Sequence, residues 1–124
     1  MCPTTIGDLA AALREVSPAV RRRVTVVFVT VDPARDTGPV LRAWLDHYDH
    51  SFVGLRGTER AILAAGRAAG VPLVPPPKHH GRSYAVDHGA LLVPYSPGGK
   101  AHVVYTQGFQ VADYAHDMKL LVDD

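Results

Sequence analysis

The stretch Val24–Val31 reads Val-Thr-Val-Val-Phe-Val-Thr-Val and consists only of apolar or β-branched residues. A strand that is buried on both faces needs this pattern, and the central strands of parallel sheets are the usual case. The loop Asp32–Thr37, with the sequence Asp-Pro-Ala-Arg-Asp-Thr, follows directly. It lies at the carboxyl end of the strand, where open α/β sheets tend to place their ligands. The stretch therefore predicts an α/β fold with a central strand and a functional loop directly after it.

Helical patterns flank this strand on both sides. The spacing of apolar residues predicts four helices, near residues 5–17, 37–48, 58–70 and 111–122. Pro39 falls in the first turn of the second helix, where proline is tolerated, and Gly70 suits the position after the third. The residues expected on the buried faces are, helix by helix, Ile6, Leu9, Leu13 and Val16; Val40, Leu41, Trp44, Leu45 and Tyr48; Ile62, Ala65, Ala68 and Ala69; and Val111, Tyr114, Ala115, Met118, Leu121 and Val122.

Further strands are predicted on the carboxyl side of the central one. Ser51–Leu55 can form a short strand, and Ala90–Tyr95 and His102–Thr106 flank the turn Ser96–Gly99 as an antiparallel hairpin. Residues 71–82 contain three consecutive prolines and are expected to be an extended surface loop. Alternation of helices and strands predicts a single domain over residues 1–124, with a central mixed sheet flanked by helices. Since Val24–Val31 calls for a parallel partner, we expect that a strand before Cys2 is missing from the chain.

Composition places the chain among ordinary globular proteins. It has 124 residues with 13 basic and 12 acidic side chains, so its formal net charge is +1. That balance argues against a nucleic-acid or anionic-membrane partner. The sequence contains one cysteine, which excludes an intramolecular disulfide, and it contains no apolar run long enough for a membrane span and no signal peptide.

Four short motifs occur in the order typical of one known family. They are Cys2–Thr5 (Cys-Pro-Thr-Thr), Val29–Thr37, Phe52–Thr58 and Tyr84–His88 (Tyr-Ala-Val-Asp-His). Together they resemble the Sco/SenC family of copper chaperones, and the resemblance spans nearly the whole chain. It implies a thioredoxin-like fold and one copper ion, Cu(I) or Cu(II), held by two cysteines and one histidine. Carried over residue by residue, the second cysteine is Cys2 and the histidine is His88.

The resemblance also implies a cellular role. Such proteins help assemble the dinuclear copper site of cytochrome c oxidase, so the expected partners are the oxidase subunit that carries this site and other copper chaperones. The expected location is the extracytoplasmic face of a bacterial membrane, with an anchor in the intact protein. The family's first cysteine would precede Met1, so we expect an N-terminally truncated domain with part of its copper site. The unpaired sheet edge left by the missing strand suggests a homodimer.

The residue types suit this chemistry. Cu(I) favours thiolate and accepts imidazole. A cysteine at the start of a helix has a lowered pKa, because the helix dipole stabilises the thiolate, and Cys2 directly precedes a predicted helix. Copper binding requires neutral imidazole at His88. Asp87 could orient a ligand through a hydrogen bond or simply belong to a turn.

Two further carboxylates lie in the loop after the central strand. Asp32 and Asp36 could cap the following helix or pair with Arg35, which are ordinary structural roles. Alternatively, they could lie near the metal or take part in docking a partner. The other histidines give weaker signals. His47 and His50 stand three apart without an evident third ligand, and His79-His80 lies in the proline-rich loop.

Two other functions compete with copper transfer. A thioredoxin-like fold could act as a thiol–disulfide oxidoreductase on the cysteines of a copper-site protein. A peroxiredoxin-like peroxidase would need one reactive cysteine, but the residues after Cys2 do not fit one. We therefore expect a metallochaperone, with an enzymatic thiol activity as the alternative.

Overall fold

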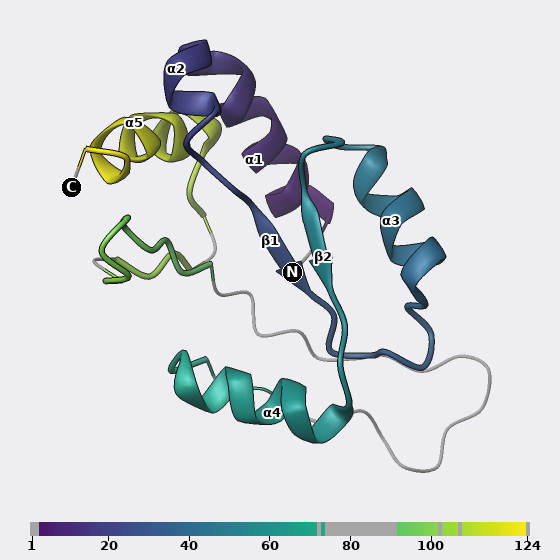
Figure 1. Ribbon diagram of the computed structural model, residues 1–124. Helices are drawn as coiled ribbons and strands as arrows, with labels where there is room; N and C mark the ends of the chain where they lie inside the picture. Colours follow the sequence, from purple (N-terminus) through teal and green to yellow (C-terminus); the bar gives the residue numbers. More distant parts are fainter. Residues whose placement is uncertain (1–2, 72, 74–91, 102, 107, 124) are drawn as a thin grey trace. The chain divides into compact units, whose positions relative to one another are not determined.

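The computed structural model describes residues 3–71, 73, 92–101, 103–106 and 108–123 (Figure 1). Its helices and strands follow the order α1 (Pro3–Glu15), α2 (Pro18–Arg21), β1 (Val27–Val29), α3 (Gly38–Asp46), β2 (Val53–Leu55), α4 (Glu59–Ala68) and α5 (Val111–Leu121). The chain divides into one unit formed by residues 1–25 and 90–124 and a second unit formed by residues 26–89. The predicted order of the four helices and the first two strands is confirmed, and α2 is an addition. The two strands predicted at 90–95 and 102–106 are present, among the described residues, only as isolated bridges.

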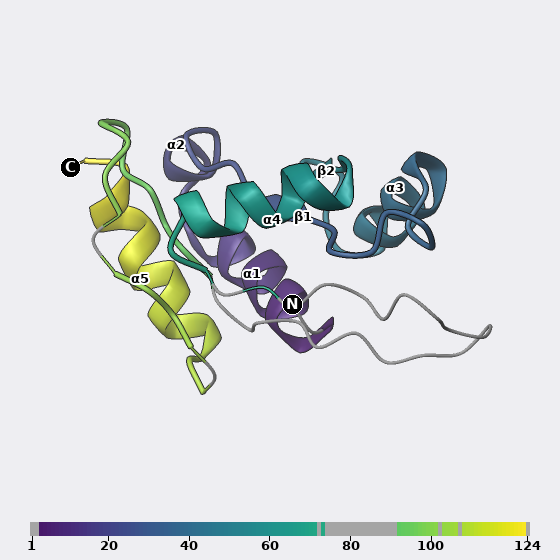
Figure 2. The same cartoon turned by 90° about the horizontal axis from the view of Figure 1, so that it is seen from below.

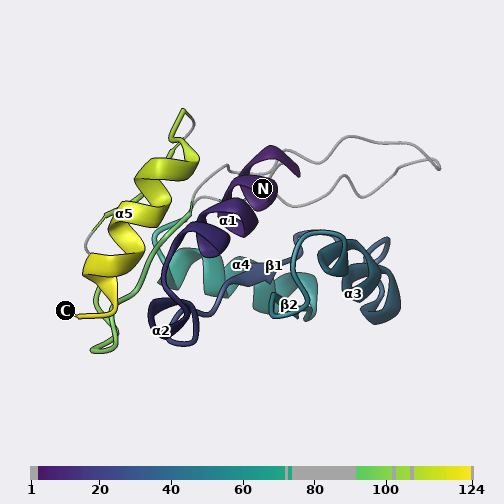
Figure 3. The ribbon, with the colours of Figure 1, turned by 90° about the horizontal axis from the view of Figure 1, so that it is seen from above.

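In the first unit, α1 and α5 pack against each other (Figure 3). Each helix turns one stripe of apolar side chains inward, because residues three and four apart share a helix face. The buried residues of the two stripes are Ile6, Leu9, Leu13, Tyr114, Ala115 and Met118, all at most 7% exposed. Val16 and Val122, predicted on the same faces, are buried as well, but Val111 and Leu121 are only partly buried. The burial predicted for α1 is therefore confirmed, and that for α5 is confirmed except at these two residues.

The predicted hairpin lies in the same unit. Antiparallel bridges join Leu92 to Tyr105 and Tyr95 to Ala101. Between them the chain turns at Ser96 and Gly99: the Gly99 N–H donates to the Ser96 carbonyl at 2.8 Å, and Gly99 adopts a φ of 78°. A left-handed φ suits glycine, which has no Cβ to clash with the carbonyl. The turn signal in the sequence thus marks the true reversal of the chain.

The second unit is built on two parallel strands. β1 pairs with β2 in the register Val27↔Val53 and Val29↔Leu55. Helix α3 contacts β2, and α4 crosses beyond the carboxyl ends of both strands (Figures 1 and 2). Thr37 and Thr58 cap these two helices, because their side-chain oxygens accept N–H groups of the first turn at 3.4 and 3.1 Å. Both predicted helix starts are confirmed.

The prediction that the central strand is buried on both faces is wrong. Phe28 is 8% exposed, but Val27 and Val29 are 43% and 42% exposed. Successive side chains of a strand point to opposite faces, so only alternate residues of β1 meet the core. In the part of the chain that the structure describes, β1 pairs with β2 alone. The homodimer through the other edge of β1 stays a prediction.

Two of the predicted helix faces also need correction. Val40 is 52% exposed, so α3 buries Leu41 and Leu45 without it. In α4, Ile62 and Gly66 are the buried residues, whereas the alanines predicted there are exposed. Alanine residues occur on both the buried and the exposed side of α4, so the positions of the alanines did not identify the buried face.

Gly54 permits the close approach of α3 to β2. A Cβ atom at this position would lie 2.7 Å from Leu41 Cδ2 and 3.0 Å from Leu45 Cδ1. Both leucines are buried and cannot move aside freely. We predict that Gly54→Ala lowers the free energy of unfolding by about 1–3 kcal/mol, the usual effect of overpacking. Chemical denaturation measures this loss.

Gly38 supplies the matched control for that substitution. A Cβ atom there meets nothing within 4 Å, and the residue opens α3. Gly38→Ala should therefore change the free energy of unfolding by less than about 1 kcal/mol, and in the stabilising direction. Equal losses in the two variants would contradict the close packing at Gly54.

Candidate metal centre

The predicted ligands Cys2 and His88 lie outside the described residues, as does Asp87. Helix α1 begins at Pro3, the residue directly after Cys2. Among the described residues, no three histidine, cysteine or acidic side chains are grouped as metal ligands would be. None of the described helices is long and apolar enough to cross a membrane.

Asp32, the first carboxylate of the loop after β1, is buried beside Arg35. It is 4% exposed, and the Arg35 Nε donates to its Oδ2 at 2.6 Å. The Arg35 backbone N–H also points at the second carboxylate oxygen, at 3.4 Å. The pairing of Asp32 with Arg35, one of the structural roles considered for it, is thus present in the structure.

Asp36, the second carboxylate, bonds to the end of the strand. The Thr30 hydroxyl donates to Asp36 Oδ2 at 2.6 Å, and the same hydroxyl accepts the Asp32 N–H at 3.0 Å. Thr30 is 1% exposed, so the hydroxyl side of this contact is buried, whereas Asp36 is half-buried. The cap of α3 is Thr37 and not Asp36. Asp36 therefore closes the loop onto β1 through a side-chain hydrogen bond.

Arg56, which follows β2 directly, holds the same loop from the other strand. Its Nε donates to the Asp36 carbonyl at 2.6 Å, and its Nη2 donates to the Pro33 carbonyl at 2.9 Å. Sequence reasoning missed this residue, although it stands inside the motif Phe52–Thr58. The loop at the carboxyl end of the sheet is consequently fixed by contacts from both strands.

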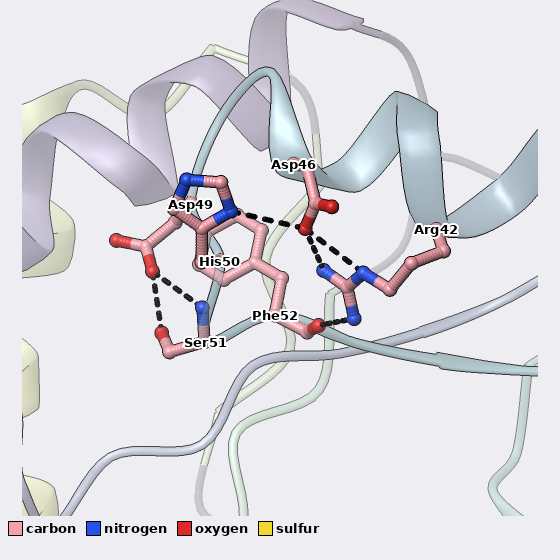
Figure 4. A network of polar contacts seen from close by, with 6 residues as sticks. All are labelled: Arg42, Asp46, Asp49, His50, Ser51 and Phe52. Atoms are coloured by element: carbon pink, nitrogen blue, oxygen red, sulfur yellow. Dashed lines mark hydrogen bonds and ion pairs between the residues drawn. The ribbon is translucent and has the colours of Figure 1, made fainter.

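A second polar network lies at the end of α3 (Figure 4). Arg42 contacts Asp46 at 2.8–2.9 Å and donates to the Phe52 carbonyl at 2.6 Å, so it joins α3 to the start of β2. His50 Nδ1 lies 3.3 Å from the same Asp46 oxygen. Desolvation would raise the pKa of Asp46, but the hydrogen bonds from Arg42 and His50 outweigh it and the pKa is lowered. Since His50 pairs with the Asp46 carboxylate, we assign the network a structural role in joining α3 to β2.

A third network connects the hairpin to α5 in the first unit. The Tyr105 hydroxyl donates to Asp117 Oδ2, and His116 Nδ1 lies 2.9 Å from Asp117 Oδ1. The Tyr105 bond and then the His116 contact hold the pKa of Asp117 below its usual value. Burial, followed by the hydrogen bond to Asp117, raises the pKa of Tyr105. Both shifts favour the hydrogen-bonded pair of a neutral tyrosine and an ionised aspartate.

The sequence model of the SCO1/SenC family matches residues 1–123. A "Putative copper-binding protein" of Stutzerimonas stutzeri is 32% identical over 99 residues, which cover 80% of this chain and 48% of that protein. "Protein SCO1, mitochondrial" of Saccharomyces cerevisiae is 31% identical over 81% of this chain and 34% of its own length. The chain thus spans about a third to a half of these relatives.

Solved structures of Sco proteins have the same fold. Yeast Sco1 with copper bound matches 99% of this chain and 68% of its own, with a TM-score of 0.84 and 26% identity. Apo Sco1 of Thermus thermophilus matches 98% and 71%, with a TM-score of 0.83 and 31% identity. The thioredoxin-like architecture predicted from the sequence is therefore confirmed. On its sequence and its fold, this chain belongs to the SCO1/SenC family.

Proposed function

We propose that the chain is a copper-binding chaperone that holds one Cu(I) ion with Cys2 and His88 as ligands. The observation that carries the proposal is the family match over residues 1–123, which includes both positions. Sco proteins of yeast and Bradyrhizobium japonicum have been solved with copper bound.

The donor set supports the choice of metal. A thiolate and a neutral imidazole are ligands that Cu(I) accepts readily. Cys2 directly precedes the 13-residue helix α1, and a helix dipole stabilises the thiolate of a cysteine at its N-terminus. A site with so few ligands can also release its metal, which a chaperone must do.

The proposed destination of the copper is the dinuclear copper site of cytochrome c oxidase. The oxidase subunit that carries this site and other copper chaperones are the proposed partners. The mouse, human and yeast relatives are mitochondrial proteins by name. For this chain we propose the extracytoplasmic face of a bacterial membrane.

We predict that the reduced chain binds one Cu(I) ion and transfers it to a soluble domain that carries the dinuclear site. Anaerobic titration followed by metal analysis of the separated proteins measures both steps. His88→Ala should abolish the transfer, whereas His50→Ala, which removes an exposed histidine, should not. Transfer that survives His88→Ala would contradict the proposal. A mixed disulfide between Cys2 and the acceptor, formed as the Cys2 thiolate attacks an acceptor disulfide and releases one acceptor thiolate, without copper transfer, would instead favour thiol–disulfide exchange.

A further inference from the structure

Strand β1 has one edge that is paired with β2 and one edge that has no strand partner among the described residues. On the paired edge, the Thr30 N–H donates to the Leu55 carbonyl at 3.2 Å. The N–H and C=O of one strand residue point to the same edge, and those of the next residue point to the opposite edge. The backbone groups of Val27 and Val29 therefore face away from β2.

The outer edge of β2 offers fewer groups for pairing. Val53 and Leu55 bond to β1, so Gly54 is the residue of this strand that turns its backbone groups outward. The Phe52 carbonyl, just before the strand, already accepts a hydrogen bond from Arg42 at 2.6 Å. The free edge of β1 is therefore the better place for a further strand in the second unit.

The sequence of β1 contains none of the features that protect a sheet edge from pairing. Such edges usually carry lysine, proline or a β-bulge, whereas Val24–Val31 contains no charged residue, proline or glycine. The side chains of Val27 and Val29 are exposed. A partner for this edge must be an extended backbone, because only another strand supplies N–H and C=O groups at the matching spacing.

We propose that the partner is a second copy of the chain, with β1 of one copy antiparallel to β1 of the other. A closed dimer has a twofold axis, and such an axis perpendicular to a sheet relates antiparallel strands. With the axis at Phe28, Val27 of each copy lies opposite Val29 of the other. Each of these pairs exchanges both N–H···O=C hydrogen bonds, so every outward-facing backbone group of β1 gains a partner. The edge is thus complementary to itself.

The exposed side chains fit the same register. Val27 and Val29 lie on one face of the sheet together with Val53 and Leu55, their partners in β2, and all four are exposed. In the dimer, each Val27 is a direct cross-strand neighbour of a Val29, and such β-branched pairs stabilise antiparallel strands. The interface consists of one short strand from each copy, so we expect a weak, reversible dimer.

The double variant Val27→Lys, Val29→Lys tests the proposal. It sets lysines directly opposite each other across the twofold axis, where like charges are destabilising. Sedimentation velocity over a range of concentrations measures the association of the metal-free, reduced chain, in which neither copper nor a disulfide can link two copies. We expect wild type to form dimers reversibly, and the variant to lose at least about tenfold in the association constant. A wild-type chain that stays monomeric up to about 1 mM would overturn the proposal.

The double variant Val53→Lys, Leu55→Lys is the matched control. It adds the same two charges to the same face of the sheet, but on β2, so the free edge of β1 is unchanged. This variant should dimerise as wild type does, and circular dichroism checks that both variants keep their helices. An equal loss of association in the two variants would overturn pairing through the edge, because the exposed apolar face would then hold the copies together.

Amide hydrogen exchange in the wild-type chain tests the same register without any substitution. The Val27 and Val29 amides should exchange more slowly as the protein concentration rises, because the dimer gives them hydrogen-bond partners. The Thr30 amide already bonds to Leu55 and should be far less sensitive to concentration. If the chain dimerises while exchange at Val27 and Val29 stays constant, the copies meet through another surface and the proposal is wrong.

Discussion

Replacing Cys2 by serine is expected to weaken Cu(I) binding by at least about a hundredfold. Mutation of a residue that only hydrogen-bonds to a metal ligand typically lowers metal affinity by about 10–100-fold, and loss of a direct ligand should lower it more. Serine has nearly the same shape, but its hydroxyl is a hard ligand that Cu(I) does not favour. The chain contains no other cysteine that could take over the role. Chelator competition measures the affinity, and circular dichroism checks that the helices persist.

Met118→Leu is the matched control for Cys2→Ser. It removes a different sulfur atom, which belongs to a buried side chain of α5, and Leu is close to Met in volume. Cu(I) affinity should be unchanged in this variant. If Cys2→Ser bound Cu(I) as tightly as Met118→Leu does, Cys2 would not be a ligand.

Replacing His88 by alanine is expected to weaken Cu(I) binding and to remove one part of its pH dependence. Only neutral imidazole can ligate the metal, and an ordinary histidine has a pKa of about 6.5. The affinity advantage of the wild type over His88→Ala should be full above that pH. It should then shrink about tenfold for each unit of pH below it, since a proton competes with the metal for the same nitrogen. The thiol contributes equally to both proteins, so the difference isolates the imidazole.

Chelator competition between pH 5 and pH 8 measures this difference. His50→Ala should follow the wild type at every pH, because His50 is an exposed side chain that pairs with Asp46. A constant ratio of affinities between wild type and His88→Ala over the whole range would contradict ligation by the imidazole. Equal affinities at all pH values would remove His88 from the site.

The sequence predicted the features that depend on local signals. Threonine caps and a glycine after the helix located α3 and α4 closely, because capping is decided within a few residues. The first helix was expected to end near residue 17, where Ser17-Pro18 stands, yet this pair also begins α2, in which the Ser17 side chain accepts the Val20 N–H at 3.3 Å. The serine–proline pair therefore lies between two helices, after the end of α1 and at the start of α2.

Contacts between distant residues could not be predicted in the same way. Arg56 reaches the carbonyl of Asp36, 20 residues away, and Arg23 donates to the Val122 carbonyl across 99 residues. Long polar side chains have many possible partners, and tertiary packing selects among them. Gly54 was also overlooked, since its importance comes from the leucines of α3 and not from its own backbone.

The candidate site was predicted from a family pattern and not from geometry. Asp32 and Asp36 were correctly placed in the loop after the strand, and the structure adds their partners Arg35 and Thr30. Cys2 and His88 stand 86 positions apart (88 − 2), so no local spacing connects them. Only the motif order of the SCO1/SenC family singled them out as a pair.

X-ray absorption spectroscopy of the Cu(I)-loaded chain tests the central claim most directly, because it identifies the atoms bound to the metal. We predict a sulfur neighbour that is lost in Cys2→Ser and imidazole scattering that is lost in His88→Ala. Copper surrounded only by nitrogen or oxygen, or a spectrum unchanged in both variants, would contradict the assignment of Cys2 and His88 as the ligands.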